Sequence, residues 1–200
     1  MLSQPPSLGI YSRAKLPTRH GPFEVVSFVD AEKRRLDDIA VVAGEVSGLA
    51  GVHTRMHSEC LTGDVFGSVR CDCRDQLELA LERIQDLGVG IVLYLRQEGR
   101  GIGIAEKVKA YALQDGGLDT VEANLHLGFD DDLRDYAVAA AMLNALGANS
   151  VALHTNNPAK VDGLAQYGVV VSSVEPIVAS RRAENARYLE TKRAKMRHRF

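Results

Sequence analysis

The order of apolar and polar residues alternates between helix and strand patterns from residue 74 onward. Apolar side chains recur at steps of three and four from Arg74 to Leu87, which predicts an amphipathic helix that begins after Asp72 and stops at Gly88. The β-branched run Val89–Leu95 follows and is typical of a buried strand. The same patterns predict helices at Ile104–Gln114 and Asp131–Leu146, strands at Ser150–Thr155 and Val169–Val174, and a short helix after the turn Asn156–Pro158.

Helices that alternate with strands indicate an α/β fold. We expect a single compact domain over residues 1–200, in which a mixed, largely parallel sheet is flanked by helices in α/β/α layers. In such sheets, functional sites collect in the loops beyond the strand ends. The loops that follow the predicted strands are therefore the places where we look for chemistry.

Composition narrows the class of protein. Of the 200 residues, 46% are hydrophobic and 25% are charged, which excludes a disordered chain and a fibre. No apolar run approaches the ~18 residues of a transmembrane helix, so we expect no membrane partner. The N-terminal segment has no basic start before an apolar stretch, which argues against a secretory signal and favours a cytoplasmic protein.

Charge is uneven along the chain. The net charge is -2, yet residues 181–200 carry eight arginines and lysines against Glu184 and Glu190. This basic C-terminal helix or tail could be an RNA-binding arm or a solvated helix docked on an acidic body. Its only aromatic residues are Tyr188 and Phe200, so it lacks the interleaved stacking residues of single-strand binders. We therefore favour the docked helix and expect no nucleic-acid partner.

The three cysteines are the sharpest local signal. Cys60, Cys71 and Cys73 follow the pattern C-x10-C-x-C, and three thiolates suit zinc. Three ligands leave one tetrahedral position for water, whose pKa zinc lowers to about 7. Two alternatives stay open on pattern alone: three ordinary buried thiols, or a closed structural site with His57 as fourth ligand.

Two loops carry groups that suit an anion. Residues Gln97–Gly103 combine three glycines with Arg100 ahead of a helix, and Thr155–Lys160 offers a threonine, backbone amides and a lysine. Ordinary capped turns explain both patterns equally well. Pattern alone also favours a surface ion pair for Asp132 and Arg134, and core packing beside Ile104 and Val108 for Tyr111.

Several segments together closely resemble the GTP cyclohydrolase II family. HSECLTGD at His57–Asp64, RCDC at Arg70–Cys73 and QEGRGIG at Gln97–Gly103 occur in that order and are highly specific. The resemblance runs from Ala14 to His198, nearly the whole chain. Further matching stretches are Lys109–Asp115, Asp119–Asn124, Leu127–Phe129, Asp132–Asp135, Thr155–Pro158 and Tyr188–Lys192.

The resemblance implies a role for each matching position. It implies one zinc ion held by the three cysteines, which moves His57 from the metal to the substrate pocket. Arg134 matches the family's proposed nucleophile toward the α-phosphate, and Asp132 matches the base that activates it. Tyr111 matches a tyrosine implicated in the ring-opening half. The implied substrate-contacting positions are Arg55, His57, Ser58, Glu59, Gln76, Glu98, Gly99, Arg100, Thr120, Thr155 and Lys160.

The family reaction converts GTP and water into formate, pyrophosphate and a diaminopyrimidinone ribosyl phosphate, the first step of riboflavin biosynthesis. The resemblance therefore implies GTP as partner, zinc and Mg²⁺ as cofactors, and a homodimer. One alternative is a relative that stops at the formamidopyrimidine product or feeds a specialised pathway, and the presence of Tyr111 argues against the early stop. A second, from another class, is a zinc-stapled nucleic-acid module. The net charge and the missing fourth ligand argue against it.

Overall fold

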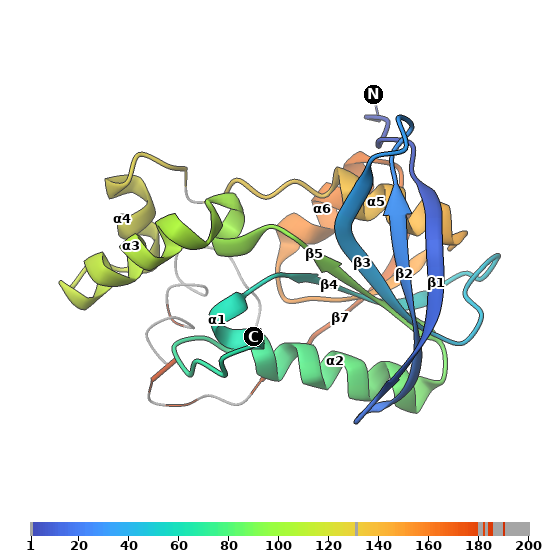
Figure 1. The fold of residues 1–200 in the computed structure, drawn as a ribbon, viewed down its shortest axis with the longest axis horizontal. Coiled ribbons are helices and arrows are strands. Elements are labelled where there is room, and N and C mark those ends of the chain that lie inside the picture. The colour runs from blue at the N-terminus through green and yellow to red at the C-terminus, as the bar shows by residue number, and fades with distance from the viewer. Residues whose placement is uncertain (1, 131, 180–181, 183, 186–189, 191–200) are drawn as a thin grey trace.

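The computed structural model describes residues 2–130, 132–179, 182, 184–185 and 190. Seven strands of this part of the chain form one sheet in the order β1-β2-β3-β5-β4-β6-β7 (Figure 1). The strands are β1 (Gly9–Thr18), β2 (Gly21–Val29), β3 (Arg35–Ala43), β4 (Val52–Ser58), β5 (Gly90–Leu95), β6 (Val151–His154) and β7 (Val171–Glu175). The helices are α1 (Leu61–Asp64), α2 (Cys73–Leu87), α3 (Gly103–Asp115), α4 (Thr120–His126), α5 (Ala137–Leu146), α6 (Pro158–Gln166) and the 3₁₀ turn η1 (Glu98–Gly101).

The sheet has an antiparallel half and a parallel half that meet at β5. β1, β2, β3 and β5 pair antiparallel, whereas β4 pairs parallel with both β5 and β6, and β6 pairs parallel with β7. The predicted mixed sheet is confirmed. Because β5, β4 and β6 run in the same direction, their carboxyl ends lie side by side and their following loops share one edge.

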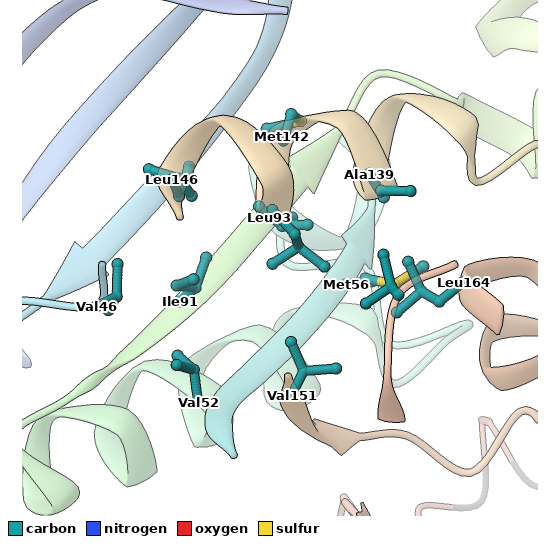
Figure 2. Close-up of a cluster of buried hydrophobic side chains, with 14 of the residues drawn as sticks. Val46, Val52, Met56, Ile91, Leu93, Ala139, Met142, Leu146, Val151 and Leu164 are labelled. Atoms are coloured by element: carbon teal, nitrogen blue, oxygen red, sulfur yellow. The ribbon is translucent and has the colours of Figure 1, made fainter. Parts of the chain in front are cut away.

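Alternating side chains on the central strands bury both faces of the sheet. Ile91 and Leu93 face α5 and α6 in the larger core, in which Met142 and Leu164 are fully buried (Figure 2). Val92, between them in sequence, packs on the opposite face against α2. The period of two in a strand places successive side chains on opposite faces, and this gives the predicted α/β/α layers.

Helices α3 and α4 stand clear of the sheet, on the side away from β1–β3 (Figure 1). They follow η1, which leads out of β5. The backbone of Arg100 in this turn has φ 63°, a left-handed conformation that is uncommon outside glycine and marks functional loops. The arm and the sheet edge enclose the region where the candidate site lies.

Most of the predicted elements are confirmed with small shifts in their ends. The helix after Asp72 is α2, and its stop Gly88 has φ 73° in the left-handed C-cap conformation. β5 is the strand predicted after Gly88, and α3 is the helix predicted from Ile104. The predicted strand, helix and strand after Gly147 are β6, α6 and β7. No sequence pattern predicts the elements of residues 1–54, where β1, β2 and β3 form most of the antiparallel half.

The helix predicted from Asp131 to Leu146 is wrong over its first turns, because α5 begins at Ala137. The Asp132 carboxylate accepts hydrogen bonds from the backbone and side chain of Arg134, and local bonds of this kind compete with helix formation. Leu133 is 45% exposed, and its N–H donates to the carbonyl of Arg100. The segment therefore lies against η1 rather than in a helix.

The predicted basic tail falls outside the described residues except for residues 182, 184, 185 and 190. Arg182 donates to Asp75 of α2 at 2.6 Å, and Asn185 is buried. Within the part of the chain that the structure describes, no helix has the length and apolar character needed to cross a bilayer.

Candidate active site

Three cysteine sulfurs converge where β4 leaves the sheet and α2 begins. Cys60 follows β4 and caps α1, and Cys73 is the first residue of α2. The sulfurs of Cys60 and Cys71 are 3.7 Å apart, and all three sulfurs lie within 4.8 Å of one another. A methyl group on Gly63 would meet the sulfur of Cys71 at 3.0 Å, so the fold leaves this glycine bare beneath the cluster.

This geometry fits a zinc ion. Sulfurs at two corners of a tetrahedron with Zn–S bonds of ~2.3 Å lie about 3.8 Å apart, close to the Cys60–Cys71 separation. The cysteines form no disulfide. Among the described residues, these three make the one group of metal-ligating side chains close enough to share an ion. The spacing signal in the sequence therefore corresponds to a real cluster.

The electrostatic environment favours a thiolate at Cys60. Hydrogen bonds with the thiols of Cys71 and Cys73, together with the ammonium of Lys107 at 3.1 Å, hold the pKa of Cys60 well below its ordinary value. The contact with Cys60 and burial raise the pKa of Cys71 to about 11. The ammonium of Lys107 thus favours negative charge on the sulfur of Cys60.

His57 lies outside the cluster. Its Nε2 is 3.0 Å from Oδ2 of Asp64, and its ring stacks on the ring of Tyr94 at a centroid distance of 5.5 Å. The same carboxylate oxygen accepts the N–H of Cys60 at 2.9 Å and the hydroxyl of Tyr94 at 2.9 Å. Burial lowers the pKa of His57, although the Asp64 carboxylate opposes that shift. His57 is therefore directed at Asp64 and not at the sulfurs.

A cavity of about 350 Å³ opens beside the sulfurs. Its walls come from the loops after β4 and β5, from both helices of the α3–α4 arm and from the segment before α5. The size is within the range of small-ligand sites. The site residues suggested by the sequence that line it are Ser58, Glu59, Cys60, Cys71, Cys73, Glu98, Gly99, Arg100, Tyr111, Thr120 and Arg134.

Glu98 has both carboxylate oxygens engaged by the protein. Oε1 accepts hydrogen bonds from Lys107 Nζ and from the N–H of Gly99, each at 2.7 Å. Oε2 accepts the N–H of Leu61 at 2.7 Å. Glu98 thus ties η1 to α3 and to the residue after Cys60.

Glu59 lies between the end of β4 and Cys60. Its carboxylate pairs with Arg96 at 2.8 Å, and burial raises its pKa.

Asp132 and Arg134 form a two-pronged ion pair at the cavity wall. Arg134 Nε donates to Asp132 Oδ1 at 2.8 Å, and Nη2 donates to Oδ2 at 2.5 Å. Burial opposes ionisation of Asp132, but the hydrogen bonds and charge of Arg134 outweigh it and hold the pKa of the carboxyl below its ordinary value. The pair is more enclosed than a surface salt bridge, since only 11% of the Arg134 side chain is exposed.

Tyr111 faces the cysteine cluster instead of the core. Its hydroxyl lies 3.2 Å from Thr62 Oγ1, which is 3.7 Å from the sulfur of Cys60. Burial raises the pKa of Tyr111, and the guanidinium of Arg70 lies 4.9 Å above its ring. Ile104 and Val108, expected beside it in the core, are exposed. The apolar stripe of α3 is therefore not a core face.

Five suggested substrate positions lie outside the cavity lining. They are His57, Arg55, Gln76, Thr155 and Lys160. Arg55 donates to the carbonyl of His154 at 2.9 Å and to Gln76 Oε1 at 2.5 Å. Burial lowers the pKa of Arg55 to about 10. Lys160 Nζ donates to the carbonyl of Met56 at 2.6 Å, and Thr155 Oγ1 accepts the N–H of Asn157. These hydrogen bonds join β4 to the end of β6 and to the loop and helix that follow it.

Three residues at the site carry no role in the sequence analysis: Lys107, Asp64 and Thr62. Lys107 lies four residues before Tyr111, so the two share one side of α3, and that spacing is the signal that could have found it. Asp64 and Thr62 lie within the quoted HSECLTGD segment, but their contacts depend on the fold of α1. No periodicity reports such contacts.

The comparisons with known proteins agree with the geometry. The sequence profile described as GTP cyclohydrolase II matches residues 10–176. The chain is 52% identical to the riboflavin biosynthesis protein RibBA of Endomicrobium trichonymphae over 92% of its own length and 45% of that protein. It is 50% identical to the GTP cyclohydrolase-2 of Proteus mirabilis over 94% of both chains, and 50% identical to that of Pseudomonas paraeruginosa over 96% of its own length and 93% of the relative. This chain therefore belongs to the GTP cyclohydrolase II family of hydrolases.

Proposed function

We propose that the protein is a zinc-dependent hydrolase that opens the imidazole ring of GTP and releases formate and pyrophosphate, as the first step of riboflavin biosynthesis. The observation that carries the proposal is the three-sulfur cluster set in the wall of a cavity, with an acid–base pair on another wall. Two relatives that the chain covers almost completely are named GTP cyclohydrolase-2.

Cys60, Cys71 and Cys73 would hold the zinc ion, which when bound supplies a Lewis acid and an activated water for hydrolysis. The remaining residues act around it. Arg100 and Arg134 bring positive charge to the cavity, which suits a triphosphate accompanied by Mg²⁺. Thr120, at the start of α4, adds a hydroxyl to the same cavity.

The two ends of GTP would be handled by different residues. Arg134 is proposed to act at the α-phosphate, where its nitrogen forms a bond to phosphorus as pyrophosphate leaves, and Asp132 takes the proton that the guanidinium gives up. Water then cleaves the phosphorus–nitrogen bond, which releases the phosphomonoester and restores Arg134. Tyr111, next to the sulfur cluster, is proposed to position the ring-opened intermediate for loss of formate. Arg55, Gln76, Thr155 and Lys160 are proposed to support the nucleoside end from the strand ends.

We further propose a cytoplasmic homodimer. Several large apolar side chains remain exposed on the α3–α4 arm and on the loop after α1, including Val108, Leu125 and Phe66. In a homodimer, a second copy of the chain would cover these apolar side chains, and their burial would stabilise the interface.

The test is to mix the purified protein with GTP and Mg²⁺ and to quantify formate and pyrophosphate. Cys71→Ser is expected to lose zinc and all formate release, because one of three ligands is gone. Ser68→Ala changes a half-buried residue of the same loop that lies outside the cavity lining, and it is expected to keep both. Full formate release from zinc-free Cys71→Ser protein would overturn the proposal. Absence of formate from zinc-loaded wild-type protein would also overturn it.

A further inference from the structure

Lys107 is a buried cation on a helix whose other lysine is exposed. Only 11% of its side chain is accessible, against 65% for Lys109 two residues further along α3. Lys107 belongs to the cavity lining and lies one helical turn before Tyr111, on the side of α3 that faces the cysteines. The neighbouring Lys109 pairs with Glu106 on the outer side at 3.0 Å.

The ammonium of Lys107 is shared between a carboxylate and a cysteine sulfur. Nζ lies 2.7 Å from Oε1 of Glu98 and 3.1 Å from the sulfur of Cys60. The other oxygen of Glu98 accepts the N–H of Leu61, the residue after Cys60, at 2.7 Å. Lys107, Glu98, Leu61 and Cys60 thus close a ring of contacts that joins α3, η1 and the start of α1 around one sulfur.

The charges explain why a lysine is buried here. A buried ammonium is costly unless it is paired, and a buried carboxylate beside a thiolate is repelled by it. Lys107 lies between the two and offsets both. A metal ligand is oriented by its own hydrogen-bonding partners, and loss of such a partner weakens metal binding even though the ligand itself is unchanged.

We propose that Lys107 is a positioning residue of the metal site: its ammonium bridges Glu98 and the sulfur of Cys60 and holds that sulfur in the arrangement that retains zinc. The inference rests on the proposed zinc function. In this arrangement Glu98 holds the ammonium of Lys107 in place. Neither residue binds the metal, and the pair supports the metal centre through Cys60.

The experiment measures zinc release from the purified, zinc-loaded protein to a chromogenic chelator. Lys107→Met is expected to release zinc about tenfold faster than wild type, or more, because the sulfur has lost its donor. Lys109→Met makes the same chemical change on the same helix and is expected to release zinc at the wild-type rate. In Co²⁺-loaded protein, Lys107→Met should also shift the thiolate-to-metal absorption band, whereas Lys109→Met should leave it in place.

A double variant keeps the test decisive if Lys107→Met fails to fold with Glu98 unpaired. Lys107→Met with Glu98→Gln removes both buried charges, yet Cys60 still lacks its donor, so accelerated zinc release is expected. Release at the wild-type rate from the double variant, with an unshifted cobalt band, would overturn the role of Lys107. Wild-type protein that binds no zinc would instead overturn the proposed function, and the two failures are therefore distinguishable.

Discussion

The Nε2 atom of His57 lies 3.0 Å from Oδ2 of Asp64, and that same oxygen accepts the backbone N–H of Cys60 at 2.9 Å. One carboxylate therefore orients both the histidine and the first cysteine of the cluster. The histidine is committed to Asp64 through one ring nitrogen. Within the described residues, its buried Nδ1 has no hydrogen-bond partner.

His57 is expected to be dispensable for zinc binding. His57→Gln removes the ring but keeps a polar side chain that can reach Asp64, so the three sulfurs keep their arrangement. Metal analysis of the purified variant should give one zinc per chain, as in wild type, while Cys71→Ser should give none. A zinc-free His57→Gln protein would restore the histidine as a fourth ligand and make the site a closed, structural one.

Arg134 is expected to control pyrophosphate release separately from ring opening. Arg134→Ala removes the group proposed to attack the α-phosphate and breaks the ion pair with Asp132, while the sulfur cluster is untouched. Pyrophosphate release from GTP, followed by a coupled phosphate assay, should stop. Some ring-opened triphosphate can still form, because zinc remains bound.

The matched control for Arg134→Ala is Arg182→Ala, which breaks another two-pronged arginine–aspartate pair, with Asp75. The arginine of this pair is more exposed than Arg134. That pair lies on the surface of α2, and its loss is expected to leave pyrophosphate release unchanged. A wild-type pyrophosphate yield from Arg134→Ala would remove Arg134 from the mechanism.

Sequence patterns found the elements that are buried in a regular way. α2 shows its apolar stripe because one side packs on the sheet and the other meets solvent, and β5 shows an apolar run because both of its faces are covered. β1 gives no such signal, since most of its residues are exposed at the edge of the sheet. A periodic pattern of apolar residues arises where one face of an element is buried and the other is exposed. An edge strand that is exposed on both faces has no such pattern.

The candidate site was the least regular part of the chain. β4 is a buried strand that contains Arg55, His57 and Thr54, all charged or polar, because it carries the site. The spacing of the cysteines and the family motifs predicted the cluster, because both signals consist of residue types and not of periodicity. The Lys107–Glu98 bridge joins groups nine residues apart across a kinked turn, and no local pattern encodes that contact.

His154 is expected to make the protein sensitive to acid. Burial, with the positive charge of Arg83 and the neighbouring ring of His53, lowers its pKa to about 4, while Glu175 opposes the shift. In the unfolded chain His154 binds a proton near pH 6.5, whereas in the folded chain it stays neutral down to about pH 4. The free energy of unfolding therefore has its full value above pH 6.5 and decreases as the pH falls toward 4. The full loss corresponds to about 3 kcal/mol of unfolding free energy.

Urea unfolding of wild type and His154→Gln between neutral pH and pH 4 measures this contribution. The variant cannot titrate but can still reach His53 Nδ1, which lies 3.0 Å from His154 Nε2 in wild type. It should lose less stability on acidification than wild type. His126→Gln, an exchange on the exposed surface of α4, should follow the wild-type curve. Parallel curves for His154→Gln and wild type would rule out His154 as the acid-sensitive group.

The hydroxyl of Tyr111 is expected to serve the second hydrolysis, the loss of formate. Tyr111→Phe keeps the ring under Arg70 and deletes the hydroxyl that lies 3.2 Å from Thr62 Oγ1. A purely structural hydroxyl would cost about 1 kcal/mol of stability and leave the product unchanged. A hydroxyl that positions the intermediate contributes about 3 kcal/mol to the transition state, and its loss slows the step more than about a hundredfold.

Under the second reading, the formamidopyrimidine accumulates from GTP while zinc stays bound, because Tyr111 is not among the sulfur ligands. Chromatography of the products from purified Tyr111→Phe protein gives the ratio of formylated to deformylated pyrimidine. Tyr167→Phe removes another tyrosine hydroxyl, one that donates to Asp135 at 3.2 Å outside the cavity lining, and it should give the wild-type ratio. A deformylated product at the normal rate from Tyr111→Phe would mean that Thr62 and Tyr111 only pack beside the metal site, and that loss of formate depends on the remaining cavity residues.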